Sequence, residues 1–289
     1  MKRIRMQFAA LALALLLPAC ASQSPAPQPP AEEPEPQITL TGRIVSVQES
    51  TVLLAGQEDG GLYSLSLDGI PWTLDGADFD PQDPAASGLP GGSLVGTLAT
   101  IAYDGGIMES YPMQLGGMES VSVTTAGFDN LCGLYLTVLE DLWNTDSGLN
   151  SDITELGIDL SQTRLSQSEQ AAVAWAFGQY TGLSPIQGTF EELAEPGYLT
   201  SEPLGDNPDG PQFWQWEDGC LFSIRETEEP VVFSLPAMET GTASTQYNGV
   251  RFDAEKWRSG LGAYIFSDCT AVSVDGFWNS YTIGSEAIS

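Results

Sequence analysis

The sequence predicts an α+β protein in which a strand-rich first part is followed by helices and then by further strands. The composition, with 31 glycines and 19 prolines among 289 residues, favours a turn-rich and strand-rich body over a helical bundle. Residues 38–125 contain short segments with the period-two alternation of half-buried strands. Helical periodicity over residues 129–143 and 166–177, ahead of strand-like segments from residue 213 onward, predicts helices packed on one face of an antiparallel sheet.

The N-terminus has the pattern of an export signal. Lys2, Arg3 and Arg5 form a basic start without acidic residues. Residues 8–17 then form an apolar run of roughly half the length that spans a bilayer, which is typical of a signal peptide and too short for a membrane helix.

The run Leu17-Pro18-Ala19-Cys20 that follows resembles the lipobox of bacterial lipoproteins. The resemblance implies a signal peptide at residues 1–19, lipid on Cys20, and a protein held to the outer face of the cell membrane; an ordinary secretory signal with an incidental cysteine is the alternative. Residues 20–37 are rich in Pro, Ala and Glu, a composition that buries too little apolar surface to fold, so we expect a disordered tether.

The charge of the chain excludes several functions. Once residues 1–19 are removed, six of the nine basic residues remain against 39 acidic ones, a formal charge of −33 in place of −30. Such a surface repels phosphate backbones, so we expect no nucleic-acid partner. The chain contains no histidine, which removes Ser-His-Asp and Cys-His catalysis and imidazole zinc sites.

The first folded unit is predicted at residues 38–125. Strand-like stretches begin at residues 38, 51, 62, 97 and 119, with a turn at Glu49-Ser50 and a long Pro/Gly/Asp-rich loop over residues 69–92. Five short strands with one long connection favour a small, partly open Greek-key barrel.

The stretch Tyr103-Asp104-Gly105-Gly106-Ile107-Met108-Glu109-Ser110-Tyr111-Pro112-Met113-Gln114 resembles a motif of small OB-type barrel domains in uncharacterised lipoproteins of Gram-positive gut bacteria. The resemblance covers roughly a third of the chain. It implies a five-stranded OB-like β-barrel and assigns no chemistry to the motif.

The second unit is predicted at residues 127–289. Residues 129–143 form its best helix; Ser166 with Glu169, and Thr189 with Glu192, are the capping boxes of two more. One strand is expected at residues 153–160, between the first two helices. Four more, at residues 213–225, 231–236, 261–274 and 277–283, are expected to form an antiparallel sheet, and residues 253–258 are interpreted as a helical turn or a bulged connection. The order is similar to the cystatin-like and nuclear-transport-factor-like cone folds.

The candidate ligand-binding residues lie in this second unit. Lys256 and Arg258 flank Trp257, which suggests an anion clamp beside an aromatic wall; the alternative is that both cations pair with acidic residues and shield the indole. Trp216 belongs to a group of aromatic residues near carboxylates that suggests sugar binding; the interpretation we favour is that they form the core of a sheet that buries helices.

No metal or cofactor site is expected. The acidic loops lack EF-hand spacing, and the methionines after Tyr103 share no strand face. Cys132, Cys220 and Cys269 are too dispersed for a CxxC motif; a Cys220–Cys269 disulfide and three buried thiols are both open.

These observations favour a membrane-anchored, non-catalytic binding or interaction module outside the cytoplasm. Its expected partners are the membrane, through the lipid, and an envelope protein, peptide or glycan. An envelope hydrolase that uses carboxylates on glycan or peptide, and a small-molecule sensing domain, are the alternatives.

Overall fold

The first part of the chain folds into a nine-stranded sheet. The computed structural model describes residues 38–227, 231–235 and 245–289, so the predicted signal peptide, Cys20 and the tether lie outside the described residues. The strands of this sheet are β1 (Ile38–Gln48), β2 (Thr51–Gly56), β3 (Leu62–Ser66), β4 (Trp72–Leu74), β5 (Ala77–Asp78), β6 (Leu98–Tyr103), β7 (Ile107–Met108), β8 (Met113–Leu115) and β9 (Ser120–Thr124). Their spatial order is β5-β4-β9-β6-β1-β2-β3-β8-β7.

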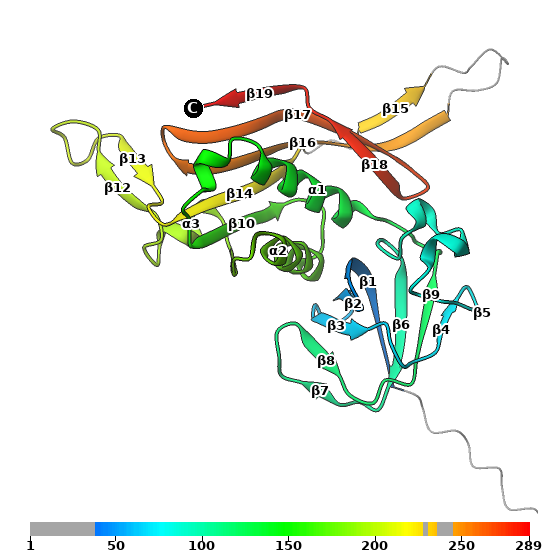
Figure 1. Cartoon of the computed structure of the whole chain (residues 1–289). Helices are drawn as coiled ribbons and strands as arrows, with labels where there is room; N and C mark the ends of the chain where they lie inside the picture. The colour runs from blue at the N-terminus through cyan, green and yellow to red at the C-terminus, as the bar shows by residue number, and fades with distance from the viewer. Residues whose placement is uncertain (1–37, 228–230, 236–244) are drawn as a thin grey trace, which may run out of the picture. The chain divides into compact units, whose positions relative to one another are not determined.

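The second part folds into a ten-stranded sheet (Figure 1). Its strands are β10 (Glu155–Gln162), β11 (Pro185–Gln187), β12 (Thr200–Pro203), β13 (Gln212–Gln215), β14 (Gly219–Glu226), β15 (Val231–Leu235), β16 (Thr245–Ser259), β17 (Gly262–Val274), β18 (Phe277–Thr282) and β19 (Ser285–Ile288). Its two longest strands, β16 and β17, form an antiparallel pair, and β10 lies parallel to both β11 and β14.

Three α-helices and three short 3₁₀ helices complete the described residues. They are α1 (Leu131–Asn144), α2 (Gln167–Thr181), α3 (Phe190–Ala194), η1 (Pro84–Ser87), η2 (Pro90–Gly92) and η3 (Ser147–Asn150). The two predicted capping boxes are confirmed, because Ser166 accepts from the Glu169 amide and Thr189 from the Glu192 amide, while both glutamates bind back. No helix among the described residues is long and apolar enough to cross a bilayer.

The predicted fold class, α+β with an N-terminal five-stranded OB-like barrel, is wrong. All five predicted strands exist, but the short strands β4, β5, β7 and β8 extend them into an open sheet. Its end strands, β5 and β7, do not pair with each other, so the sheet does not close. Two or three residues are too few to show a period-two pattern, which is why the sequence did not reveal these additions.

The predicted antiparallel C-terminal sheet, with its cone-like variants, is also wrong in topology. The sheet is mixed, because β10 pairs in parallel with β11 on one side and with β14 on the other, while the remaining pairs are antiparallel. Residues 253–258 lie inside β16, where register shifts mark irregularities in its pairing with β17, and they form no helical turn. The segment predicted as one strand over residues 213–225 divides into β13 and β14 around Trp216.

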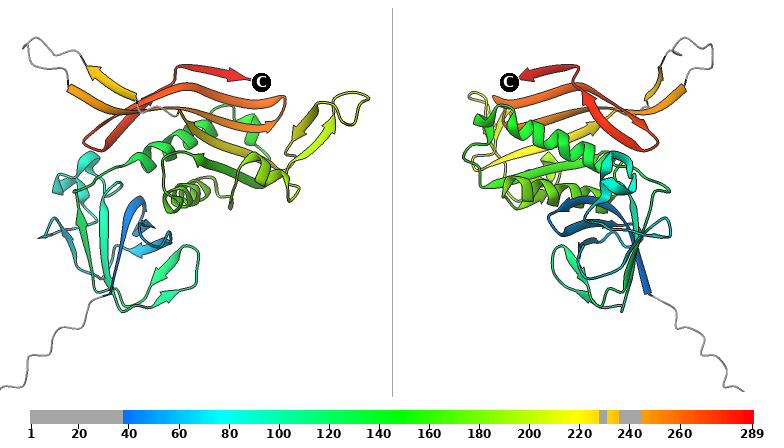
Figure 2. Two further views of the ribbon diagram at one scale, coloured as in Figure 1. Left: turned by 180° about the vertical axis from the view of Figure 1, so that it is seen from behind. Right: turned by 45° about the vertical axis from the view of Figure 1, so that its right-hand side comes forward.

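Helix α2 contributes to a core that both sheets share. Ala172, Val173 and Phe177 are buried in the same apolar cluster as Leu53 of β2 and Phe222 of β14. Figure 2 shows α1 and α2 on one face of the ten-stranded sheet. Residues 37–289 form one compact unit; the predicted boundary between residues 125 and 127 stays a prediction.

A second apolar cluster fills the other side of the nine-stranded sheet. Its members include Ile44, Leu54 and Ile101, which are fully buried. In β2, Val52 and Leu54 therefore point to this cluster, while Leu53 and Ala55 point to the core shared with α2. Strand β2 is buried on both faces, as the alternation of its side chains requires.

The three cysteines of the described residues are free and buried. Leu221, next to Cys220, pairs with Trp257, whereas Cys269 pairs with Phe252. These two positions on β16 are about 17 Å apart at roughly 3.3 Å per strand residue, well beyond the ~7 Å that a disulfide spans between Cα atoms. The Cys220–Cys269 disulfide is therefore excluded.

We predict that Cys132, Cys220 and Cys269 do not react with Ellman's reagent in the folded chain and react together after denaturation. Burial raises the pKa of the Cys220 and Cys269 thiols to about 12, so the thiolate that reacts is scarce at neutral pH. The measurement uses a Cys20→Ser chain with and without urea. Rapid labelling of any thiol without urea would contradict the prediction.

Candidate functional site

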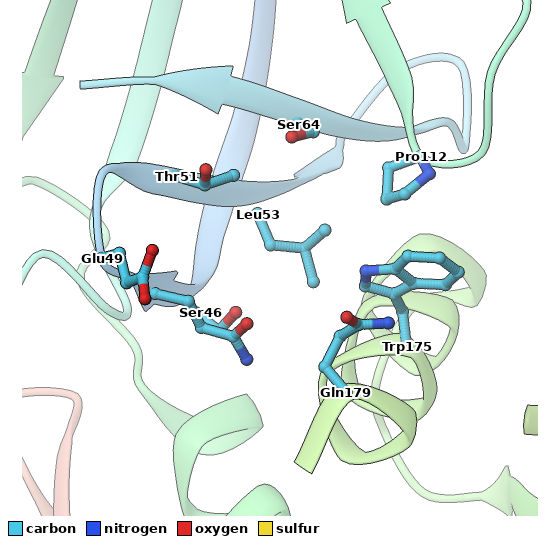
Figure 3. A pocket seen from close by; sticks show the side chains of 9 residues that line it. Ser46, Glu49, Thr51, Leu53, Ser64, Pro112, Trp175 and Gln179 are labelled. Carbon is cyan, nitrogen blue, oxygen red and sulfur yellow. The ribbon is translucent and has the colours of Figure 1, made fainter. Parts of the chain in front are cut away.

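A groove beside α2 is the candidate binding site. It has a volume of about 530 Å³, within the range of roughly 300–1,000 Å³ that small-molecule sites occupy. Figure 3 shows its lining side chains, which come from β1, β2, β3, the loop before β8 and α2. They are Ser46, Gln48, Glu49, Thr51, Leu53, Ser64, Pro112, Trp175 and Gln179.

The strand register explains why these side chains share one face. Ser46 of β1 pairs with Leu53 of β2, and Leu53 pairs with Ser64 of β3, so the three form a row across the sheet. Gln48 pairs with Thr51 one step further along. Because side chains two residues apart lie on the same face of a strand, these positions form the wall of the groove opposite α2.

Helix α2 supplies an indole and an amide to the groove. Trp175 and Gln179 are four residues apart and therefore lie on one side of the helix, from which both project toward the strands (Figure 3). Trp175 is half-buried and packs edge-to-face against Tyr111, with ring centroids 5.4 Å apart. Pro112, next to Tyr111, lies above the indole, so the apolar part of the groove consists of Trp175, Pro112 and Leu53.

The polar side chains of the groove are free to bind a ligand. Within the described part of the chain, the hydroxyls of Ser46, Thr51 and Ser64 and the amides of Gln48 and Gln179 make no hydrogen bond to another residue. Glu49 is the one carboxylate among the lining residues, and none of those residues is basic. The groove therefore offers neutral donors and acceptors around an apolar patch, with negative charge at one end.

Two further cavities are less suited to a ligand. In the one between η2, α1 and β18, of about 270 Å³, Asn130 and Trp278 bind each other through their backbone and amide groups. The cavity between β3 and η1 contains no aromatic side chain, and its Asp68 accepts from Gln82 at 2.6 Å. Their polar groups are largely used within the chain.

The structure separates the predicted clamp. Lys256 is fully buried, and its ammonium donates to the carbonyls of Thr145 and Asp146 and to Asn150 Oδ1, the last two at 3.0 and 2.8 Å. Burial lowers the pKa of Lys256. Arg258, two residues further along the same face of β16, donates to the Leu149 carbonyl at 3.2 Å and the Glu217 carbonyl at 2.7 Å. Both cations thus bind backbone carbonyls in the segment after α1, and Arg258 also binds the connection between β13 and β14.

The two predicted aromatic residues lie apart from these cations. Trp257 points to the opposite face of β16, where it packs on Phe190 of α3 with ring centroids 5.1 Å apart. Trp216 is 1% exposed and donates from Nε1 to Glu155 at 2.6 Å, so it belongs to a core. A ligand role for half-buried Trp257 stays a prediction, whereas Lys256 and Trp216 do not reach the surface.

Carboxylates with a raised pKa do not meet in a site. Burial raises the pKa of Glu140 on α1 and of Glu255 on β16. Neither lines the groove beside α2, where Glu49 is the single carboxylate. Among the described residues, no three His, Cys, Asp or Glu side chains are grouped to hold a metal ion.

Fold and groove together define a mostly β protein with two open, mixed sheets and a ligand-sized groove at the helix between them. No protein-family model, curated protein or solved structure matches the chain.

We predict that Lys256→Ala lowers the free energy of unfolding by about 3 kcal/mol, because it leaves the buried Asn150 amide oxygen and two partly buried carbonyls without a donor and opens a cavity. Urea denaturation measures the change. Arg251→Ala removes the same charge from an exposed position on the same strand, and we expect it to stay within about 0.5 kcal/mol of the wild type. Equal losses in both variants would contradict a structural role for the buried ammonium.

Proposed function

We propose that this chain is an extracytoplasmic lipoprotein, anchored through Cys20, whose body binds a ligand in the groove beside α2 without chemical turnover. The observation that supports binding is the set of free hydroxyls and amides around Trp175, Leu53 and Pro112. An apolar patch with a few convergent polar groups is the usual composition of a ligand site.

The proposal favours binding over hydrolysis. A carboxylate-dependent glycosidase needs two carboxyl groups about 5–10 Å apart, one of them with a raised pKa. The groove contributes Glu49 alone, at an exposed turn. A sensing role would use the same groove, and no observation on the described residues favours it over simple binding.

The anchor is supported by the lipobox-like run that ends at Cys20. The mature body would then be held away from the membrane by residues 21–37. Its strong negative charge would keep the body off anionic lipid headgroups, so the covalent lipid would be the only membrane contact.

We predict that the chain expressed in a lipoprotein-processing bacterium incorporates a labelled fatty acid and that Cys20→Ser abolishes the label. The reason is that lipid is attached to this thiol after cleavage of residues 1–19. Cys132→Ser, which removes a buried thiol, is the control and retains the label. An unlabelled wild-type chain that keeps its leader would overturn the anchor.

We predict that a thermal-shift screen of the full Cys20→Ser chain against metal ions, sugars and peptides finds a class that raises the Tm of the wild type by several degrees at saturating concentration. Trp175→Leu should cancel the shift, because it removes the indole and keeps apolar volume on α2. Tyr180→Ala, an exposed aromatic position on the same helix, should preserve it. Tm shifts of equal size in all three chains would show that the ligand binds outside the groove. The absence of any Tm shift in the wild type would contradict the binding proposal.

A further inference from the structure

The distribution of apolar and polar side chains in the groove narrows the class of ligand that it can bind. Trp175, Leu53 and Pro112 form an apolar patch that is bordered by five hydroxyl or amide side chains. A pyranose ring has the matching distribution, since C–H groups cover its faces and hydroxyls its rim. The negative π-face of an indole attracts such C–H groups, while the polar rim is free to hydrogen-bond the hydroxyls.

The polar side chains match hydroxyls in their capacity to donate and accept. Ser46, Thr51 and Ser64 each offer one O–H donor and two acceptor lone pairs. Gln48 and Gln179 each offer an NH₂ donor and a carbonyl acceptor. A sugar hydroxyl also does both, so every group of the rim can be satisfied without a change of protonation.

An extended peptide is less well matched. Peptides that bind to sheets do so mainly through main-chain hydrogen bonds to a free strand edge. The strand at the centre of this groove, β2, is bonded to β1 on one side and to β3 on the other along residues 51–55. The groove therefore presents the face of a sheet and its side chains, with no unpaired backbone edge at β2.

The charge of the groove determines the charge of the ligand that it can bind. None of its lining residues is basic, and Glu49 is acidic. Four of the six basic residues in the described body, Arg43, Arg164, Lys256 and Arg258, are bound to carboxylates or carbonyls inside the chain. The other two, Arg225 and Arg251, lie on strands of the ten-stranded sheet. An anionic ligand would find no counter-charge here and would be repelled by the body.

We infer that the groove binds a saccharide without negative charge, one ring of which stacks on Trp175. This inference rests on the proposed function of the same groove. Glu49 adds a preference for an amine-bearing sugar over a neutral one, through charge-assisted hydrogen bonding at the end of the groove.

The test is calorimetric titration of the full Cys20→Ser chain with tetrasaccharides. Neutral members contain glucose, mannose, galactose or N-acetylglucosamine; de-N-acetylated chitotetraose carries amines, and tetragalacturonate carries carboxylates. We expect binding by at least one neutral or amine-bearing member and at least about tenfold weaker binding of tetragalacturonate.

Variants then locate the ligand. Trp175→Leu should weaken binding at least about tenfold without loss of fold, Trp175→Phe should retain most of it, and Tyr180→Ala should not change it. Glu49→Gln should weaken the amine-bearing member selectively. Glu58→Gln, an exposed carboxylate outside the groove, is its matched control.

Failure of the inference is distinguishable from failure of the proposed function. If no neutral or amine-bearing saccharide binds at millimolar concentration, or if tetragalacturonate binds best, the inference is wrong. A Trp175-dependent response to a proline-rich decapeptide in the same titration would then keep the binding function and replace the ligand class. If Trp175→Leu changes the affinity for neither the saccharides nor the peptide, both proposals are wrong.

Discussion

The burial of α2 against both sheets is the constraint on which the arrangement depends. Ala172, Val173, Ala174 and Phe177 are fully buried, and their cluster includes side chains of β2 and β14. A helix that is apolar on nearly all sides is stable only when it is covered on nearly all sides. Its alanines let the two sheets approach, and Ser168 fixes the start of the helix to the Gly56 carbonyl of β2 at 2.8 Å. The groove lies where this cover ends and Trp175 is left half-buried.

The chain has few basic residues, and their positions determine both the hydrogen bonds inside the fold and the negative charge of its surface. Arg43 of β1 binds Glu169 of α2 at 2.9 Å and also donates to the carbonyls of Gly96 and Gly127. Lys256 donates to two partly buried carbonyl oxygens just after α1 and to the buried amide oxygen of Asn150. Because these cations serve the fold, they cannot neutralise the surface. None of these few basic residues lines the groove. Their scarcity therefore affects both the stability of the fold and the charge of the ligand that the groove can bind.

Local signals in the sequence were sufficient for the three α-helices and for long strands such as β1 and β17, but they missed β16, the longest strand, part of which was interpreted as a helical turn or a bulged connection. The caps at Ser166 and Thr189 are confirmed because each depends on residues three apart in the chain. The short strands β4 and β8 were missed because they exist through pairing with distant strands, β4 with β9 and β8 with β3. Strands β5 and β7 pair only with β4 and β8, and at two residues each they are too short to show an alternating pattern. The predicted, partly open five-stranded barrel was wrong for a related reason, since which strand edges meet is decided by long-range pairing and no local pattern records it.

The candidate site shows the same division between local and non-local information. Strand alternation, applied to residues 256–258 as part of β16, places Lys256 and Arg258 on one face and Trp257 on the other. On β3, the same alternation places Ser64 and Ser66 on the face opposite Tyr63 and Leu65. What the sequence could not show is that Trp175, more than a hundred residues later, lies opposite that face. They come together because α2, whose central residues 171–178 are apolar, packs against β2, a strand that is buried on both faces. The site is therefore a consequence of the shared core.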